Sequence, residues 1–310
     1  MQMKKNLTDL FNDYFNEVKY SARLRPRTIQ GYKAVFDLFL KVMPEVSSIE
    51  YLTPEMLTEF FKRIETRQRV VGNSITSGVK KSTIRTFWFK LHVFFVWLHK
   101  RGYIEENPLK TIKPPQVEYI DFRRLTDREI HKIYAAIVCH SANSFMMRRD
   151  TAMISLLLYC GLRKGEFVSL QIRDIDLYKN EIIIRGETSK SKRTRILKIH
   201  PTLALHLKDY IKERNVNGLK TEHLFASIKK DCGLTVFGLK HWVDTLIKKS
   251  GIDFHLHQFR HTFACKLAEA NVNVFKIQKM MGHTDIAMTM KYVRSLRTED
   301  MENDINKISV

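Results

Sequence analysis

Residues 181–200 read EIIIRGETSKSKRTRILKIH, and this stretch decides the fold class of the second half of the chain. Two apolar or β-branched runs, Ile182–Ile184 and Ile196–Ile199, flank a turn-like centre. Six positions from Arg185 to Lys198 are Lys or Arg. Short apolar runs on both sides of a turn are typical of a β-hairpin. The stretch therefore predicts a small antiparallel sheet.

Helical periodicity surrounds this hairpin on both sides. Thr126, with Glu129 three residues later, predicts a helix that begins with a capping box. Gly161 and Gly282 each follow an apolar helical run and predict its end. We expect a mostly helical second domain, with further helices around 149–160, 163–171, 201–214 and 235–250 and three more between 255 and 295.

A proline-containing stretch, ENPLKTIKPPQVEYIDFRR (106–124), precedes this domain. It holds three of the seven prolines and shows little periodicity. Pro114 and Pro115 cannot continue a helix. We therefore expect a first domain over 1–112, a linker over 113–124 and a second domain over 125–310.

The first domain is predicted to be small and entirely helical, with four or five helices. Apolar residues recur at helical spacing over 6–20, 29–43, 54–67 and 83–102. Thr28, Thr53 and Ser82 are the predicted N-caps of the last three helices. VVGNSITSGVKK (70–81) is rich in Gly and Ser and predicts a loop.

The chain is strongly basic, with 53 Lys and Arg against 33 Asp and Glu and a formal charge of +20. The excess is +8 over residues 1–120 and +12 over residues 121–310. A broadly basic globular protein most often binds a polyanion, and nucleic acid is the first candidate; a basic surface that serves only solubility is the alternative. Cations at predicted helix starts suit phosphate groups, or form a solvated basic face: Arg23, Arg25, Arg27, Lys80, Lys81 and Arg85.

Several classes of protein are excluded by composition. The longest apolar run, near Ala152–Leu162, is far shorter than the ~20 residues that span a bilayer. The N-terminus lacks the apolar region of a secretory signal. No nucleotide-binding glycine loop is visible. The cysteines form no CxxC pair, which argues against zinc and disulfides and suits a reducing compartment: Cys139, Cys160, Cys232 and Cys265.

Donors suited to a phosphodiester recur in the second domain. The transition state of phosphoryl substitution carries charge on non-bridging oxygens, which an enzyme without a metal must meet with fixed donors such as Arg. Arg163 follows a Gly-Leu turn at a helix start, and His257 and Arg260 share one helical turn. His283 follows a predicted C-cap glycine, and Tyr292 lies nine residues beyond it.

These residues belong to three motifs that resemble the tyrosine recombinases, also called phage-integrase-type recombinases. The first Arg box reads GLRKGEFVSL (161–170), the second reads HQFRHTFA (257–264) and the third reads MGHTDIAMTMKY (281–292). FFVWLHKRGYIEENP (94–108) resembles the helical core-binding domain of that family. The resemblance therefore implies a mainly α fold, with an N-terminal helical core-binding domain and a C-terminal mixed α/β catalytic domain that is mostly helical.

The resemblance implies a role for each motif residue. Tyr292 is the expected nucleophile, which forms a 3′-phosphotyrosyl link and frees a 5′-hydroxyl. Arg163 and Arg260 are expected to clamp the non-bridging oxygens. His283 is expected to donate to the phosphate. Glu166 is expected to orient Arg163, although a plain helix-surface acid is the alternative.

Three histidines are candidates for the catalytic histidine of the second box. His257 is expected to act in acid–base catalysis or to orient groups near Tyr292. His255 is a weaker alternative, since it lies five residues before Arg260 rather than three. His261 is assigned to packing.

The family places a lysine in the hairpin loop as general acid for the departing 5′-oxygen. Lys190 fits best here, and Lys192 or Arg193 are alternatives because loop length varies. Lys192 and Arg193 are also candidates for simple contacts with the DNA backbone. Lys198 stands where many relatives have Pro.

As a whole, the resemblance implies a site-specific recombinase of the simple Xer-like layout. It would act on double-stranded DNA as a homotetramer through a Holliday junction, in the cytoplasm at the nucleoid, without metal or nucleotide. Met301, Ile305 and Ile308 suit docking on a neighbouring subunit or on the chain's own domain. The alternatives are a non-catalytic DNA-binding protein on this scaffold and a type IB topoisomerase or telomere resolvase.

Overall fold

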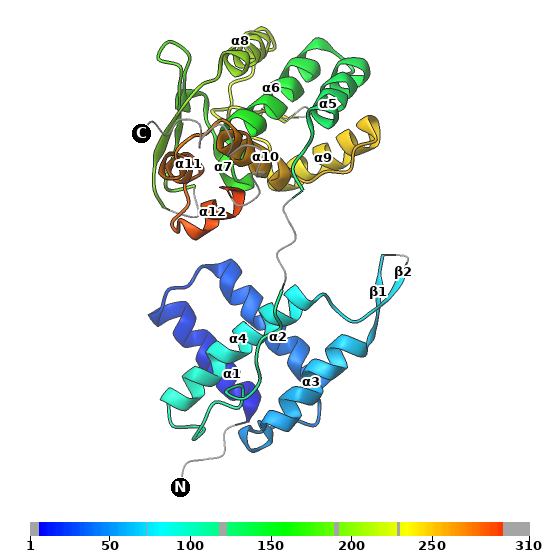
Figure 1. Ribbon diagram of the computed structural model, residues 1–310, viewed down its shortest axis with the longest axis vertical. Coiled ribbons are helices and arrows are strands. Elements are labelled where there is room, and N and C mark those ends of the chain that lie inside the picture. The colour runs from blue at the N-terminus through cyan, green and yellow to red at the C-terminus, as the bar shows by residue number, and fades with distance from the viewer. Residues whose placement is uncertain (1–5, 73, 118–122, 189–191, 228–229, 294–310) are drawn as a thin grey trace, which may run out of the picture. The chain divides into compact units, whose positions relative to one another are not determined.

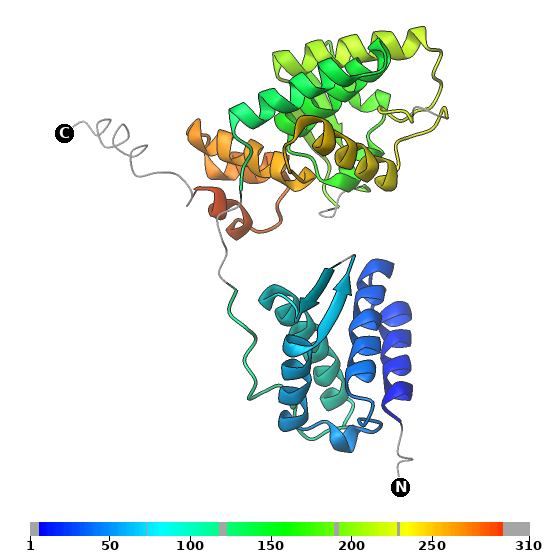
Figure 2. The ribbon, with the colours of Figure 1, turned by 90° about the vertical axis from the view of Figure 1, so that its right-hand side faces the viewer.

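The computed structural model describes residues 6–72, 74–117, 123–188, 192–227 and 230–293. The chain divides into two compact units, Met1–Tyr119 and Ile120–Val310, which Figures 1 and 2 show from two directions. Helices α1–α12 dominate both units, and each unit contains one small antiparallel sheet. This confirms the expected mainly helical fold class.

In its described residues, the first unit contains four α-helices and one β-hairpin. Three of the helices meet in an aromatic core, where Phe11 of α1 stacks on Phe36 of α2 with ring centroids 4.1 Å apart, and Phe94 of α4 lies 4.5 Å from Phe11. The helical spacing of these rings therefore serves packing. The elements are α1 (Leu7–Asn16), α2 (Pro26–Val42), α3 (Pro54–Thr66), β1 (Gln68–Val71), β2 (Ser74–Ser77) and α4 (Lys81–Lys100).

The prediction of a loop at 70–81 is wrong for most of its length, because β1 and β2 pair as an antiparallel hairpin. Val70 lies opposite Ile75 across the hairpin, and both side chains are exposed. Gly72 takes the positive φ that the tight connection needs. The hairpin was missed because no face of it is buried, so it lacks the apolar alternation that marks a strand.

Two predicted helix starts are also wrong. The helix α2 begins at Pro26 with Arg25 as its N-cap, so Thr28 lies inside the helix. Proline at the first helical position is pre-organised for the helix, which explains the earlier start. Lys80, not Ser82, is the N-cap of α4. The predicted cap at Thr53 is confirmed, since its hydroxyl accepts from the Met56 N–H at 3.3 Å.

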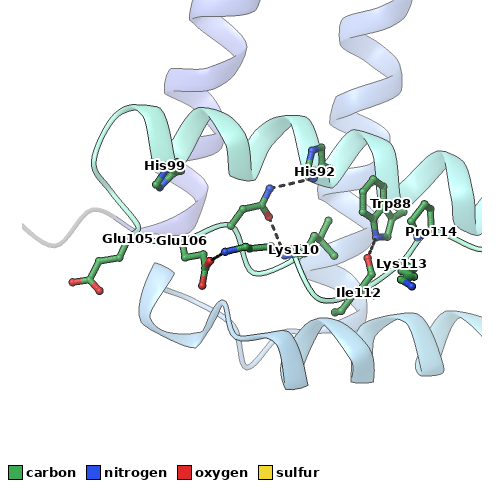
Figure 3. A pocket seen from close by; sticks show the side chains of 11 residues that line it. Trp88, His92, His99, Glu105, Glu106, Lys110, Ile112, Lys113 and Pro114 are labelled. Atoms are coloured by element: carbon green, nitrogen blue, oxygen red, sulfur yellow. Dashed lines mark hydrogen bonds and ion pairs between the residues drawn. The ribbon is translucent and has the colours of Figure 1, made fainter.

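The segment that follows α4 folds back along this helix and encloses a cavity of about 670 Å³. Figure 3 shows the Trp88 indole N–H donating to the Ile112 carbonyl at 2.8 Å. One helical turn further on, the His92 ring nitrogen lies 3.1 Å from the Asn107 amide. Arg85 donates to the Pro115 carbonyl at 3.2 Å. Residues 112–115 therefore pack against α4 within the first unit.

The second unit contains eight helices and a three-stranded sheet among its described residues. Its predicted capping box is confirmed, since Thr126 and Glu129 exchange bonds at the start of α5. The predicted C-caps Gly161 and Gly282 are confirmed as left-handed residues. The helices are α5 (Asp127–His140), α6 (Ser144–Cys160), α7 (Lys164–Ser169), α8 (Pro201–Val216), α9 (Val236–Ser250), α10 (Leu256–Glu269), α11 (Val274–Met281) and α12 (Ala287–Val293).

The helix α6 forms the centre of this unit. Residues 152–157 are all buried, so α6 is covered around its whole circumference. It packs against α5, α8 and α10, and Figure 1 shows α5 and α8 alongside it. Because α10 packs in turn against α11 and α12, it contributes Phe259 to the core around α6 and Phe263 to a second hydrophobic cluster that includes Tyr292.

The predicted hairpin is confirmed as β4 (Glu181–Ile184) and β5 (Arg195–Lys198), and β3 (Ile175–Asp176) adds a third antiparallel strand in the order β3-β4-β5. Ile182 pairs with Leu197, and both are buried. Strand alternation turns Arg195 to the same buried face as Leu197. The sheet therefore delivers a charged side chain into the interior.

Candidate active site

Arg163 occupies the N-cap position of α7, directly after the turn that ends α6. Gly161 makes this turn with a φ of +54°, and a Cβ atom there would come within 2.5 Å of the Phe263 ring. The Arg163 backbone N–H and Nη1 donate to the Glu166 carboxylate at 2.9 and 3.0 Å. The turn and the acid together fix the guanidinium, whose side chain stays 20% exposed.

Glu166 is a buried carboxylate that serves two arginines. It also accepts from Arg195 Nη1 and Nη2 at 3.1 and 2.8 Å. A buried acid is stable only when it is paired and hydrogen-bonded, and Glu166 meets this condition between Arg163 and Arg195. The alternative that Glu166 is a plain surface acid is therefore wrong.

Three consecutive carbonyls at the end of α11 each accept from an arginine. Arg195 Nε donates to Met280 O at 2.8 Å, Arg260 Nη2 donates to Met281 O at 2.5 Å and Arg163 Nη2 donates to Gly282 O at 2.9 Å. These carbonyls lack helical partners and carry the negative end of the helix dipole. The α11 terminus thus gathers cations from α7, α10 and β5.

Arg260 is the most deeply buried of these cations, with 1% of its surface exposed. Its Nη1 donates to Gly161 O at 2.7 Å, so it also contacts the first motif. Burial, together with the charge of Arg163, lowers the pKa of Arg260 to about 9. The guanidinium is therefore still charged at neutral pH, although it has few water contacts.

Tyr292 lies on α12 with its side chain buried against α10. Its hydroxyl is 3.0 Å from Nδ1 of His261. The His283 ring lies nearly parallel to the phenol, at 10° and 6.2 Å between centroids. Burial raises the pKa of Tyr292, and the nearby Arg260 charge opposes this effect. The hydroxyl is thus neutral at rest and needs a proton acceptor to become a nucleophile.

His283 is oriented by the helix that carries Tyr292. Its Nδ1 lies 2.9 Å from the hydroxyl of Thr289, which is fully buried. Burial, with Arg260 and Arg163 nearby, lowers the pKa of His283 to about 3, so the ring is neutral. If Thr289 donates to Nδ1, the ring proton resides on Nε2, and that nitrogen becomes a donor.

His257 and His255 differ from these buried rings because both are exposed. The His257 ring meets the His261 ring edge-on at 4.6 Å between centroids. His255 is the N-cap residue of α10, and its backbone N–H donates to Gln258 Oε1 at 2.8 Å. His255 therefore closes a capping box.

One cavity of about 130 Å³ unites these groups. Its walls include five of the residues that the motifs single out, together with His261: Arg163, His257, Arg260, His261, His283 and Tyr292. A small cavity with two guanidiniums, imidazole rings and a phenol can hold an anion beside a nucleophile.

The basic residues of the hairpin loop that the structure describes lie at the surface. Lys190 lies outside the described residues. Lys192 has a φ of +54° and is exposed, as is Arg193. Arg193 lines a second cavity, of about 370 Å³, that also includes His283. The hairpin is thus adjacent to the motif residues.

Four of the six basic residues predicted at helix starts in the first unit lie there, whereas Arg23 lies in the turn before α2 with a φ of +48°. Arg25 and Arg27 are at the start of α2, and Lys80 and Lys81 are at the start of α4; all four are exposed. Arg85 is half-buried, and its guanidinium lies 5.4 Å from the Phe89 ring centroid.

Sequence reasoning missed three residues of this site. Arg195 could have been found from the strand period, which places it beside the buried Leu197. His261 is buried, as its assignment to packing implies, but its ring also contacts the Tyr292 hydroxyl. Thr289 had no signal in the sequence, because its partner is set by how α12 packs.

Within the described ranges, no group of three His, Cys, Asp or Glu side chains is placed to hold a metal ion. Across the same part of the chain, no helix has the length and apolar character needed to cross a membrane.

The chain is similar to known proteins over most of its length. Residues 123–299 match the model of the phage integrase family. The chain is similar to a tyrosine recombinase of Thermosipho africanus, at 30% identity over 296 residues that cover 92% of this chain and 93% of that protein. It is also similar to tyrosine recombinase XerA of Saccharolobus solfataricus, at 29% identity over 96% and 92% of the two chains.

Solved structures share the fold. The integrase of transposon Tn1549 in complex with transposon right-end DNA has a TM-score of 0.79 at 18% identity, with 99% of this chain and 100% of that chain covered. A lambda integrase dimer bound to a core site has a TM-score of 0.72 at 19% identity, with 95% and 79% covered.

Proposed function

Because this chain belongs to the phage integrase family of tyrosine recombinases, we propose that it cleaves and rejoins a specific DNA site through a covalent bond between Tyr292 and a 3′-phosphate. The observation that carries this mechanism is the shared cavity of Tyr292, Arg163 and Arg260. The fold of Tn1549 integrase bound to DNA supports DNA as the substrate.

In the proposed reaction, the phenolic oxygen of Tyr292 forms a bond to phosphorus while the bond to the 5′-oxygen breaks. The phosphate remains a diester, so the bond energy is retained for rejoining and no nucleotide is consumed. Arg163 and Arg260 bind the two non-bridging oxygens, on which charge builds up. Glu166 and Arg195 act as positioning residues, because they hold Arg163 against the α11 terminus.

The histidines supplement these cations. His283 donates from Nε2 to a non-bridging oxygen, with its tautomer set by Thr289. His257 stands at the edge of the cavity, exposed and in ring contact with His261, and orients that ring or assists proton transfer.

Lys190 is the proposed general acid that protonates the departing 5′-oxygen. Lys192 and Arg193 follow it in the sequence and bind the DNA backbone. The support is the position of the hairpin, since Arg193 and His283 line one cavity.

DNA is proposed to be held by both units, with residues 113–124 as the linker between a core-binding domain (1–112) and a catalytic domain (125–310). Both parts carry a basic excess, and exposed cations lie at the starts of α2 and α4. We expect the affinity of the whole chain to fall steeply with salt and to exceed that of either fragment. A fragment that matched the full-length affinity and footprint would contradict this arrangement.

The proposed assembly is a homotetramer on two DNA sites that exchanges strands through a Holliday junction. This rests on family membership and on the DNA-bound dimer of lambda integrase among the structural neighbours. Met301, Ile305 and Ile308, which were expected to dock on a neighbouring subunit, lie outside the described residues. Such an enzyme acts on nucleoid DNA in the cytoplasm.

Tyr292→Phe tests the nucleophile. A binding site is first selected from a random duplex library, and nicked duplexes that carry the site then trap the covalent adduct. We expect Tyr292→Phe to bind this DNA with unchanged affinity and to form no adduct. The parent chain should form the adduct in EDTA without nucleotide. An adduct in the variant, mapped to another tyrosine, would refute the assignment.

A sulfur substitution tests the general acid. A 5′-bridging phosphorothioate releases a thiolate, which leaves without a proton. Lys190→Ala should therefore be slow on normal DNA and largely rescued on this substrate, whereas Arg163→Ala should not be rescued. Rescue of Lys192→Ala alone would move the role to Lys192.

A further inference from the structure

The hydroxyl of Tyr292 is paired with the imidazole of His261, to which the motifs assign no catalytic role. Nδ1 of His261 is 3.0 Å from the phenolic oxygen, within hydrogen-bond range, and both side chains are buried. Their rings lie 5.5 Å apart and line the cavity that contains the two guanidiniums. His261 is therefore in contact with the atom that must lose a proton.

His257, the residue expected from the motif to serve Tyr292, is placed differently. It is exposed, and its ring packs edge-on against His261. His257 and His261 are four residues apart on α10, so they lie one helical turn apart on the same face. The order in space is then His257, His261 and Tyr292, with His261 in the central position.

We propose that His261 is the general base of strand cleavage. This inference rests on the proposed function. As the phenolic oxygen of Tyr292 bonds to phosphorus, its proton passes to Nδ1 of His261, and the 5′-oxygen leaves with a proton from the hairpin lysine. In rejoining, the 5′-hydroxyl attacks phosphorus and returns its proton to the lysine. The phenolate leaves and recovers its proton from His261, so both groups end as they began.

The electrostatic environment is consistent with this cycle. Burial, with His257, His255 and Arg260 nearby, lowers the pKa of His261 to about 4, so the ring is neutral and able to accept. Bound DNA would place a phosphate anion beside Arg260 and offset part of that positive field. Proton uptake by His261 therefore becomes more favourable when the substrate is in place.

His261→Asn separates proton transfer from mere orientation. The amide oxygen of Asn can stand near the position of Nδ1 and accept a hydrogen bond, but it cannot take up a proton. Adduct formation is measured with the full-length chain on the selected nicked duplex. We expect His261→Asn to bind DNA normally and to form the adduct about 10²-fold more slowly or worse.

The decisive readout is rescue by an acidic phenol. A fluorinated tyrosine that ionises below neutral pH is incorporated at position 292, so the nucleophile no longer needs a base. This substitution should restore most of the lost rate in His261→Asn. It should restore little in His257→Asn, the matched control on the same helix. Near-normal cleavage by His261→Asn, absent rescue, or rescue confined to His257→Asn would each overturn the proposal.

The tautomer of His261 can be measured on the unmodified chain, so the proposal stays testable even if the variants do not fold. Nitrogen chemical shifts of His261 should show a proton on Nε2 and none on Nδ1, which accepts from the Tyr292 hydroxyl; the opposite tautomer would overturn the proposal. Absence of any adduct in the parent chain at Tyr292 would instead contradict the proposed function, so the two failures are distinguishable.

Discussion

Gly282→Ala perturbs the point at which the arginines converge, and Gly251→Ala supplies its matched control. Both glycines end a helix in the left-handed region, with φ of +63° and +67°. A Cβ atom at Gly251 would meet nothing within 4 Å, whereas at Gly282 it would lie 3.0 Å from Arg195 Nη1 and 3.5 Å from Arg163 Nη1. The two variants therefore share backbone strain and differ in crowding.

The magnitudes follow from this difference. Alanine in the left-handed region costs about 1–2 kcal/mol, which both variants should lose. Arg195 cannot retreat freely, because Glu166 and the Met280 carbonyl hold it. A hydrogen bond to a charged group contributes about 1.5–3 kcal/mol, and weakening one should make Gly282→Ala about 1–2 kcal/mol worse than Gly251→Ala.

Urea unfolding of the full chain measures both losses in the second unit. Fluorescence of Trp242 reports this unit in a background where Trp88 and Trp97 are replaced by Phe. We expect adduct formation to be slowed in Gly282→Ala and to remain at the parent rate in Gly251→Ala. Equal losses of stability with equal cleavage rates would refute the view that Gly282 is needed for the arginine cluster.

Other perturbations address separate features. Thr289→Val should slow adduct formation about tenfold or more, since His283 loses the hydroxyl that orients it. Burial holds the pKa of His261 at about 4 and that of His283 at about 3, below the unfolded value of ~6.5. Acidification below that value therefore protonates the unfolded chain first, and urea unfolding should show a loss of stability of up to about 1.4 kcal/mol per pH unit for each ring. His261→Asn should remove the part of this loss that comes from His261, whereas His283, His257 and His206, whose pKa values are also lowered, still contribute. Thr126→Ala should cost about 1 kcal/mol in the same assay and leave the cleavage rate unchanged, because it removes only a helix cap.

Local chemistry explains which parts of the fold could be predicted from sequence. Caps such as Thr53 and Thr126 act within three residues, so their pattern is visible in the sequence. Thr28 misled the prediction because Pro26, two residues earlier, already satisfies the first helical position. The exposed hairpin β1–β2 could not be predicted from apolar periodicity, because none of its described side chains is buried.

The candidate active site also combines residues that could be predicted from the sequence with residues that could not. The motif spacing predicted Arg163, Arg260 and Tyr292, and the structure brings them to one cavity. The contact of His261 with the phenol depends on how α12 packs against α10, a tertiary feature that spacing does not encode. The sequence motifs assign no role to Arg195, and the strand pleat turns its side chain inward to Glu166.

The end of α11 acts as a common reference for parts of the chain that are far apart in sequence. Because Met280, Met281 and Gly282 are covalently linked, a displacement of this turn carries their three carbonyls together. The attached guanidiniums then keep their mutual spacing, even if the loops that lead to them change length. We therefore expect insertions in the hairpin loop to leave the spacing of the three guanidiniums unchanged. A shift of α11 by one residue would instead move all three guanidiniums together. The three arginines and the end of α11 therefore move together as one rigid group.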